Sequence, residues 1–214
     1  MRSDVQLAIK EERMNAITHG AGILGSIIAF VMLIQAALEQ GDLLTLIGGM
    51  IYGTTLILMF TISTIMHSLP FNGRKKRFVM YDHMSIYVFI AGSYTPFLLI
   101  SMDKQHGLPV LVIIWASAIA GIIYKWFYTG KHMWLSTLGY LVMGWFVAVL
   151  WSDLHAALGV QGLKLLVAGG ACYTLGIVFF VWEGLRYHHA IWHLFVLAGA
   201  ALHYVCVYMV ISGG

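Results

Sequence analysis

Charged residues are scarce in this chain of 214 residues. Lys and Arg number 12 and Asp and Glu number 9, so 10% of the chain is charged while 60% is hydrophobic. A soluble globular domain has about 25% charged residues, and a water-soluble fold of this size leaves roughly a third of its surface exposed. The composition therefore excludes a soluble domain and a disordered chain, and it indicates an integral membrane protein. The net charge of only +3 excludes a nucleic-acid-binding protein.

Cysteine is also rare, and the apolar stretches do not alternate strictly with polar residues. Cys172 and Cys206 are the two cysteines, and both fall within apolar stretches, which excludes a disulfide scaffold. Continuous apolar stretches likewise exclude an outer-membrane barrel. These two absences leave membrane-spanning α-helices as the expected structure.

Seven apolar stretches approach the length of about 20 residues that a helix needs to cross the hydrocarbon core. They are Ile17–Leu38, Leu43–Met66, Val79–Ile100, Leu108–Tyr124, Met133–Trp151, Leu163–Trp182 and His189–Ile211. The polar breaks between them are too short to fold by themselves. We therefore expect an all-α integral membrane protein, a single domain over residues 1–214 with seven transmembrane helices and a short cytoplasmic N-terminal segment, residues 1–16.

Basic residues are divided unevenly between the two sides of this topology. Lys104 and Lys164 lie on one side, and the other ten lie on the side of the N-terminus. Those ten are Arg2, Lys10, Arg13, Arg74, Lys75, Lys76, Arg77, Lys125, Lys131 and Arg186. Because cytoplasmic loops carry an excess of Lys and Arg, we expect a cytoplasmic N-terminus and an extracellular C-terminus.

Five polar residues within or at the ends of these spans are candidates for function, because burying such groups is costly unless they have partners. Asp82 is the one acidic residue inside a predicted span. Ser63 and His67 are four residues apart and share a helical face, as do His189 and His193. The predicted topology places all five near the cytoplasmic ends of three spans, so we expect them to converge.

Three imidazoles and one open position form the ligand set of a catalytic zinc site. We therefore expect His67, His189 and His193 to bind Zn²⁺, although iron and copper also suit such ligands. Asp82 would orient an imidazole or take a proton from the bound water, and Ser63 would hydrogen-bond that water or a developing oxyanion. The mechanistic hypothesis is attack by zinc-activated water on an acyl or amide carbonyl of a lipid held among the helices.

Simpler roles remain open for two of these residues. Asp82 could be a counter-ion to Arg77 or His83, or it could stabilise the start of its helix. Ser63 could hydrogen-bond the carbonyl one turn earlier in its own helix.

Two other polar groups are assigned supporting roles. Glu12, Asn15, Thr18 and His19 form a cluster that could cap the first helix or hold loops over the site. His203 lies in the middle of the last span, where we expect an interhelical hydrogen bond rather than a metal ligand.

The sequence resembles the hemolysin III family, the bacterial branch of the progestin and adipoQ receptor superfamily. The resemblance is carried by Glu12–Gly20 (ERMNAITHG), Ser63–His67 (STIMH), Asp82–Tyr87 (DHMSIY), Ala91–Phe97 (AGSYTPF) and His189–His193 (HAIWH). It implies seven helices in the bacterial inner membrane, with the orientation argued above. It also implies zinc held by the three histidines, with Asp82 and Ser63 close by. The similar alkaline ceramidases hydrolyse lipid amides at such a site, which makes membrane lipids, including a fatty acid within the bundle, the expected partners.

Two other functions compete with lipid hydrolysis. The family takes its name from cytolytic activity attributed to some bacterial members, but no helix here carries the continuous polar stripe of a pore. A non-enzymatic, metal-stabilised receptor or signalling protein is the other alternative. The long N-terminal domain of the eukaryotic receptors is missing, which argues against a protein hormone as the ligand.

Overall fold

The computed structural model describes residues 2–213, and all regular structure in that range is helical. The side chains of residues 2–4 lie outside the described part, including that of Arg2, which entered the charge count above. The α-helices are α1 (Arg2–Gln40), α2 (Leu43–Ser68), α3 (Gly73–Pro96), α4 (Lys104–Tyr128), α5 (Met133–Trp145), α6 (Trp151–Val181) and α7 (His188–Ser212). A short π-helix, η1 (Phe97–Ser101), follows α3, and a short 3₁₀-helix, η2 (Phe146–Leu150), joins α5 to α6. The all-α prediction is therefore confirmed for the described residues.

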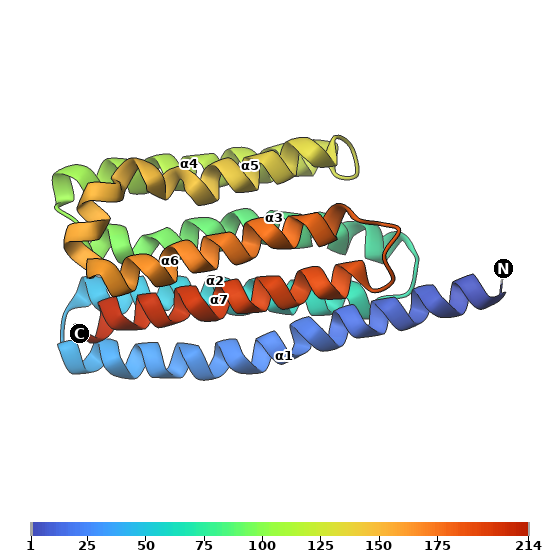
Figure 1. Ribbon diagram of the computed structural model, residues 1–214, viewed down its shortest axis with the longest axis horizontal. Coiled ribbons are helices and arrows are strands. Elements are labelled where there is room, and N and C mark those ends of the chain that lie inside the picture. Colours follow the sequence, from blue (N-terminus) through green and yellow to red (C-terminus); the bar gives the residue numbers. More distant parts are fainter. Residues whose placement is uncertain (1, 214) are drawn as a thin grey trace.

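Six helical stretches of the described chain are long and apolar enough to cross a membrane. One of them, Met133–Val181, is 49 residues long and comprises α5, η2 and α6. Both predicted spans Met133–Trp151 and Leu163–Trp182 fall almost entirely within it. Gly159 interrupts this stretch with φ 61° and ψ −173°, a conformation that is essentially restricted to glycine. Figure 1 shows α5 and the part of α6 beyond this break running in opposite directions.

Helix α3 begins earlier than the apolar pattern predicts. Asn72 caps it by accepting hydrogen bonds from the backbone N–H groups of Arg74 and Lys75, at 2.9 Å and 3.3 Å. Asp82 therefore lies more than two turns inside the helix, and the alternative in which it stabilises the helix start is wrong. Acidic side chains cap other helices, Asp42 at the start of α2 and Asp103 at the start of α4. The backbone N–H and the hydroxyl of Thr45 both donate to the Asp42 carboxylate at 2.8 Å, and these bonds lower the pKa of Asp42.

Helix α1 is 39 residues long and begins at Arg2 rather than near Ile17. Residues 2–16, predicted as a short segment before the first span, are thus its first turns, and Figure 1 shows these turns extending beyond the other helices. The cluster Glu12–His19 lies inside α1, so the prediction that it caps the helix start is wrong. The four side chains instead lie along a continuous helix.

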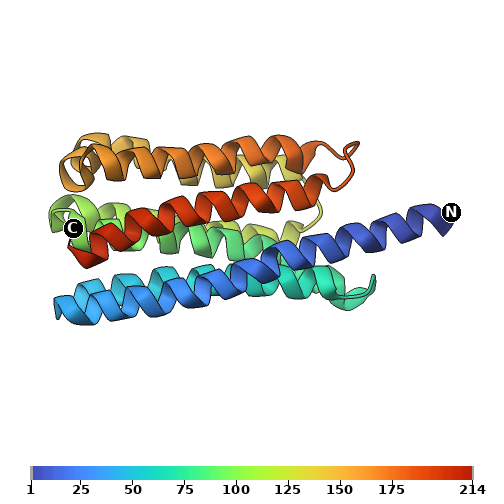
Figure 2. The ribbon, with the colours of Figure 1, turned by 60° about the horizontal axis from the view of Figure 1, so that its bottom comes forward.

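The helices lie side by side along one axis, as Figures 1 and 2 show from two directions. Large apolar side chains cover the outside: Leu24, Val112 and Val149 are 67%, 68% and 72% exposed. Leu33 and Tyr52, in contrast, are fully buried. An apolar surface of this extent is compatible with lipid rather than water around the bundle.

The start of α4 packs so closely on η1 that one position requires glycine. A Cβ atom at Gly107 would overlap the backbone carbonyl oxygen of Leu98, whereas one at Gly25 in α1 would meet nothing within 4 Å. We expect Gly107→Ala to reduce stability by about 1–3 kcal/mol, because backbone atoms would have to move. Gly25→Ala is expected to be neutral or to stabilise by up to about 1 kcal/mol through helix propensity.

Thermal unfolding of the two variants and the unchanged protein, purified in the same detergent, measures this difference. Equal melting temperatures for Gly107→Ala and Gly25→Ala would show that the contact between α4 and η1 is not tight.

Candidate metal centre

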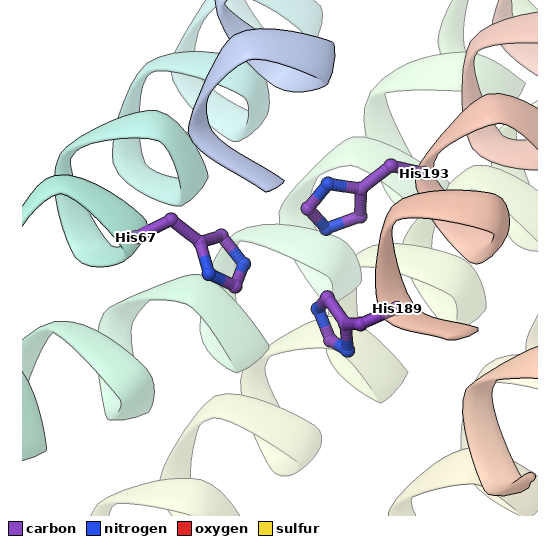
Figure 3. A group of neighbouring side chains, drawn as sticks. All are labelled: His67, His189 and His193. Carbon is purple, nitrogen blue, oxygen red and sulfur yellow. The ribbon is translucent and has the colours of Figure 1, made fainter. Parts of the chain in front are cut away.

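Three histidines from two helices meet at the end of the bundle where the α2–α3 and α6–α7 connections lie (Figures 1 and 3). His67 lies in the last turn of α2, and His189 and His193 lie in the first turns of α7. Each offers a ring nitrogen, and these nitrogens lie within 4.8 Å of one another. The ring centroids are 4.7–5.0 Å apart. Because successive turns of a helix place residues i and i+4 on one face, α7 presents two imidazoles to the third on α2.

The hydrogen bond to Nδ1 of His67 determines which of its nitrogens could bind a metal. Oε2 of Glu12 in α1 lies 3.0 Å from this nitrogen, and Nζ of Lys75 donates to the same oxygen at 2.6 Å. An ionised carboxylate only accepts hydrogen bonds. Nδ1 of His67 therefore carries the proton, which leaves the lone pair of the neutral ring on Nε2.

His193 is held in the same tautomer by different groups. Its Nδ1 lies 3.2 Å from the backbone carbonyl oxygen of Asn15 and 3.0 Å from the Thr18 hydroxyl oxygen. A carbonyl oxygen only accepts, and the Thr18 hydroxyl can donate its own proton to that same carbonyl at 2.9 Å. Nδ1 of His193 is thus the donor, and its Nε2 also carries a lone pair.

These residues fit a transition metal. Nε2 of His67 is buried and has no hydrogen-bond partner among the described residues, as expected of a nitrogen whose lone pair is directed at a ligand. Metal-bound histidines in proteins almost always donate the other ring N–H to a carboxylate or a carbonyl, as His67 and His193 do here. The three histidines could therefore hold one metal ion, as predicted.

The two remaining candidates lie on a cavity next to the histidines. Ser63 and Asp82 line this cavity together with His189 and His193, and its volume is about 190 Å³. Ser63 lies one helical turn before His67 on α2, and both side chains are buried. All five residues that the sequence brings together are thus neighbours in the structure.

The rest of the cavity is mostly apolar. It extends away from the histidines between α3, α5, α6 and α7, and its lining includes Phe89, Leu141, Leu166 and Val196. Such a space suits a hydrocarbon chain better than a polar molecule.

Helix α1 supplies direct contacts to the histidines rather than a loop above them. Glu12 binds His67, the Asn15 carbonyl binds His193, and the His19 ring stacks on that of His193 with centroids 3.4 Å apart. Asn15 and His19 are both buried. Lys75 is the functional neighbour that sequence reasoning missed, because its position in the basic run Arg74–Arg77 indicated only orientation.

His203 and His188 lie outside the group of three. Nε2 of His203 lies 3.0 Å from the carbonyl oxygen of Leu166 in α6, which confirms the predicted interhelical hydrogen bond. Nδ1 of His188 lies 3.0 Å from the carbonyl oxygen of Phe179. Both rings are occupied by backbone partners.

Comparison with known proteins identifies the family of this chain and several relatives. A family model described as "Haemolysin-III related" matches residues 7–204. The chain belongs to the hemolysin III family. It is 44% identical to "Hemolysin-3" of Bacillus cereus over 93% of this chain and 91% of that protein. The "Hemolysin-3 homolog" of Bacillus subtilis is 43% identical over 93% of both chains.

A human relative extends the similarity beyond bacteria. The chain is 33% identical to the human "Monocyte to macrophage differentiation factor" over 92% of this chain and 83% of that protein. With its bacterial hemolysin III relatives and its six long apolar helices, the chain is a multi-pass bacterial membrane protein. The predicted family and membrane location are therefore confirmed.

The tautomers described above predict which histidine substitutions abolish metal binding. We expect His67→Ala and His193→Ala to lose a stoichiometric metal ion that the unchanged protein retains, because each removes an Nε2 ligand. His203→Ala is the matched control, a partly buried histidine of α7 whose Nε2 faces a carbonyl. Metal content of the purified proteins by mass spectrometry measures the difference, and full metal content in both ligand variants would contradict this ligand set.

Proposed function

We propose that this hemolysin III protein is a zinc-dependent membrane hydrolase that cleaves acyl or amide bonds of lipids and contributes to membrane homeostasis. The observation that carries the proposal is the group of three histidines, two with Nε2 lone pairs set by hydrogen bonds, at the end of an apolar cavity lined by Asp82 and Ser63. A structural site for zinc normally has four protein ligands. Three histidines leave one position for water or substrate.

Zinc is favoured over other metals by the chemistry of the ligands. Neutral imidazole suits zinc, iron, copper and nickel, whereas magnesium and calcium prefer oxygen ligands. A set of three imidazoles and no thiolate is a common catalytic zinc site. Zinc bound here would supply Lewis acidity that activates water and polarises a carbonyl group.

Asp82 and Ser63 would perform the proton transfer and stabilise the developing charge. A carboxylate oxygen of Asp82 accepts a proton from the attacking water and then returns it to the amine or alkoxide that leaves. The Ser63 hydroxyl donates a hydrogen bond to the carbonyl oxygen as negative charge develops on it. Their positions on the wall of the cavity that His189 and His193 also line support these roles.

The apolar cavity and the location of the protein in a membrane both support a lipid as the substrate. The acyl chain would lie along the apolar wall that includes Phe89, Leu141 and Leu166, with the scissile bond next to the histidines. A water-soluble substrate would leave that wall without a partner. A fatty acid released by the reaction would fit the same cavity.

The names of two relatives point to alternative functions. The name "Hemolysin-3" of the Bacillus cereus protein points to cytolysis, and the name of the human differentiation factor points to a signalling role, which in this chain would be stabilised by the metal. Neither function needs proton transfer by Asp82, so substitution of Asp82 distinguishes the hydrolase from both alternatives.

We also propose that the chain crosses the membrane seven times, with a cytoplasmic N-terminus. The 49-residue stretch Met133–Val181 is about twice the length of a single span, and the break at Gly159 supports two crossings. The excess of basic residues beside the N-terminus and the even-numbered loops supports this orientation.

The catalytic proposal predicts that activity and metal binding separate on substitution. We expect Asp82→Asn to lower kcat about 100- to 10,000-fold by removing the base, and Ser63→Ala to lower it about 100-fold or more by removing an oxyanion donor. Both variants should retain zinc. Turnover of a ceramide and of a phospholipid in mixed micelles, followed by release of fatty acid, measures the effect.

Two controls test whether these losses are specific. Ser93→Ala removes another hydroxyl from the cavity wall, one that donates to its own helix at Ile90, and Asp153→Asn alters a partly exposed acid far along the chain. Both should leave turnover unchanged. Lipid turnover that persists in Asp82→Asn would eliminate the catalytic role, and lysis of liposomes by metal-free protein would favour cytolysis.

The topology proposal predicts where single cysteines react. In a protein with Cys172 and Cys206 replaced by alanine, we expect Lys131→Cys and Glu183→Cys to be labelled from the cytoplasmic side. His155→Cys, between the two crossings, should be labelled by an impermeant maleimide on intact cells. Labelling of Lys131→Cys and Glu183→Cys from opposite sides would show that Met133–Val181 crosses only once.

A further inference from the structure

Lys75 is buried although it belongs to a run of basic residues. Its exposed fraction is 7%, whereas its neighbours Arg74 and Lys76 are exposed. A buried ammonium group is costly unless it is fully paired. Lys75 therefore needs an explanation that topology alone does not provide.

The contacts of Lys75 account for all three protons of its ammonium group. Nζ donates to Oε2 of Glu12 at 2.6 Å, to the carbonyl oxygen of Met66 at 3.0 Å and to that of Leu69 at 3.3 Å. The two carbonyls are at the C-terminal end of α2, where backbone oxygens lack partners within the helix and attract a cation. Lys75 thus joins α1, the end of α2 and the start of α3.

The same oxygen of Glu12 also contacts His67. Oε2 accepts from Nδ1 of His67 at 3.0 Å and from Nζ of Lys75 at 2.6 Å. His67 is itself in the last turn of α2, directly beside the carbonyl of Met66 that Lys75 binds. Lys75 therefore holds both the carboxylate that orients the ring and the helix end that carries it.

A carboxylate without this cation would orient the ring less well. The Glu12 side chain is 24% exposed and that of His67 only 4%, so the pair lies at the margin of the buried region. The Lys75 charge favours the ionised carboxylate, which can only accept. It also keeps Oε2 close to Nδ1, so that Nε2 points away from α1 toward His189 and His193.

We propose that Glu12 and Lys75 are positioning residues that act through His67 to set metal affinity. The inference rests on the metal site of the proposed function, and it adds the Lys75 ammonium group as a cation that helps to orient one ligand. His193 needs no such pair, because the backbone carbonyl of Asn15 performs the same task. The affinity of the site for zinc thus depends on a chain of side-chain contacts from Lys75 to Glu12 to His67, which we call the relay and which substitution can interrupt.

Zinc affinity of the full-length protein in detergent tests the relay. We expect Glu12→Ala and Lys75→Met to weaken zinc binding about 10- to 100-fold, the usual effect of removing a group that orients a metal ligand, as measured by competition with a chromophoric chelator. Lys75→Arg, which keeps the charge, should restore part of the loss. Lys76→Met and Glu39→Gln, both exposed, are matched controls and should bind zinc as the unchanged protein does.

The tautomer of His67 in the zinc-free protein separates positioning from a general structural role. With ¹⁵N-labelled histidine, the His67 signal, assigned by its loss in His67→Ala, should report a proton on Nδ1. In Glu12→Ala we expect a mixture of tautomers. The melting temperature of the zinc-free protein should also fall, because the Lys75 ammonium group loses its charged partner, so the tautomer is the measurement that a purely structural role would not change. Unchanged zinc affinity and an unchanged tautomer in Glu12→Ala would overturn the inference.

The outcomes for the metal and for the relay can be told apart. If the unchanged protein binds no zinc, the proposed metal centre is wrong, and the tautomer measurement still decides whether Glu12 orients His67. If Lys75→Met does not fold, Lys75→Arg and Glu12→Asp preserve both charges but displace the bonding atoms. Weaker zinc binding in these two variants would support the relay, and binding equal to that of the unchanged protein would overturn it.

Discussion

The hydrogen bonds that α1 accepts from two imidazoles are the interactions on which the site depends. Nδ1 of His67 and Nδ1 of His193 both donate to oxygens of this helix, one to a side chain and one to the backbone. A neutral imidazole has one proton, so fixing it on Nδ1 directs the lone pair of Nε2 into the space between α2 and α7. Helix α1 supplies none of the three candidate metal ligands, yet it determines the tautomer of two of them.

Burial explains why these contacts come from the protein itself. A polar group that water cannot reach is costly unless it finds a partner in the bundle. Lys75 satisfies its three protons with Glu12 and two carbonyls at the end of α2. The apolar cavity begins beside this polar end and extends along the bundle, so the histidines lie next to a space lined mostly by apolar side chains.

Much of the site could be predicted because helical spacing and topology are readable in the chain. His189 and His193 share a face by their spacing of four, and the direction of each span placed Ser63, His67 and Asp82 near the same end. The contacts of α1 could not be predicted in this way. The cluster Glu12–His19 lies at the start of the first apolar stretch, where polar residues are typical of a helix cap. Only the structure shows that the helix continues through them.

The composition of the sequence by itself determined that the protein lies in a membrane. The lengths of the apolar stretches and the spacing of the histidines determined the all-helical class and the candidate ligands, because these are local properties of the chain. Tertiary structure decided which polar groups pair. In the sequence Lys75 is one charge of a basic run, and only the packing of α1 and of α3 against α2 brings its ammonium group to Glu12. The break at Gly159 likewise depends on a backbone conformation that the apolar pattern does not report. Contacts between residues 55 or 63 positions apart, such as Glu12 with His67 and Lys75, arise from packing and leave no periodic signal in the sequence.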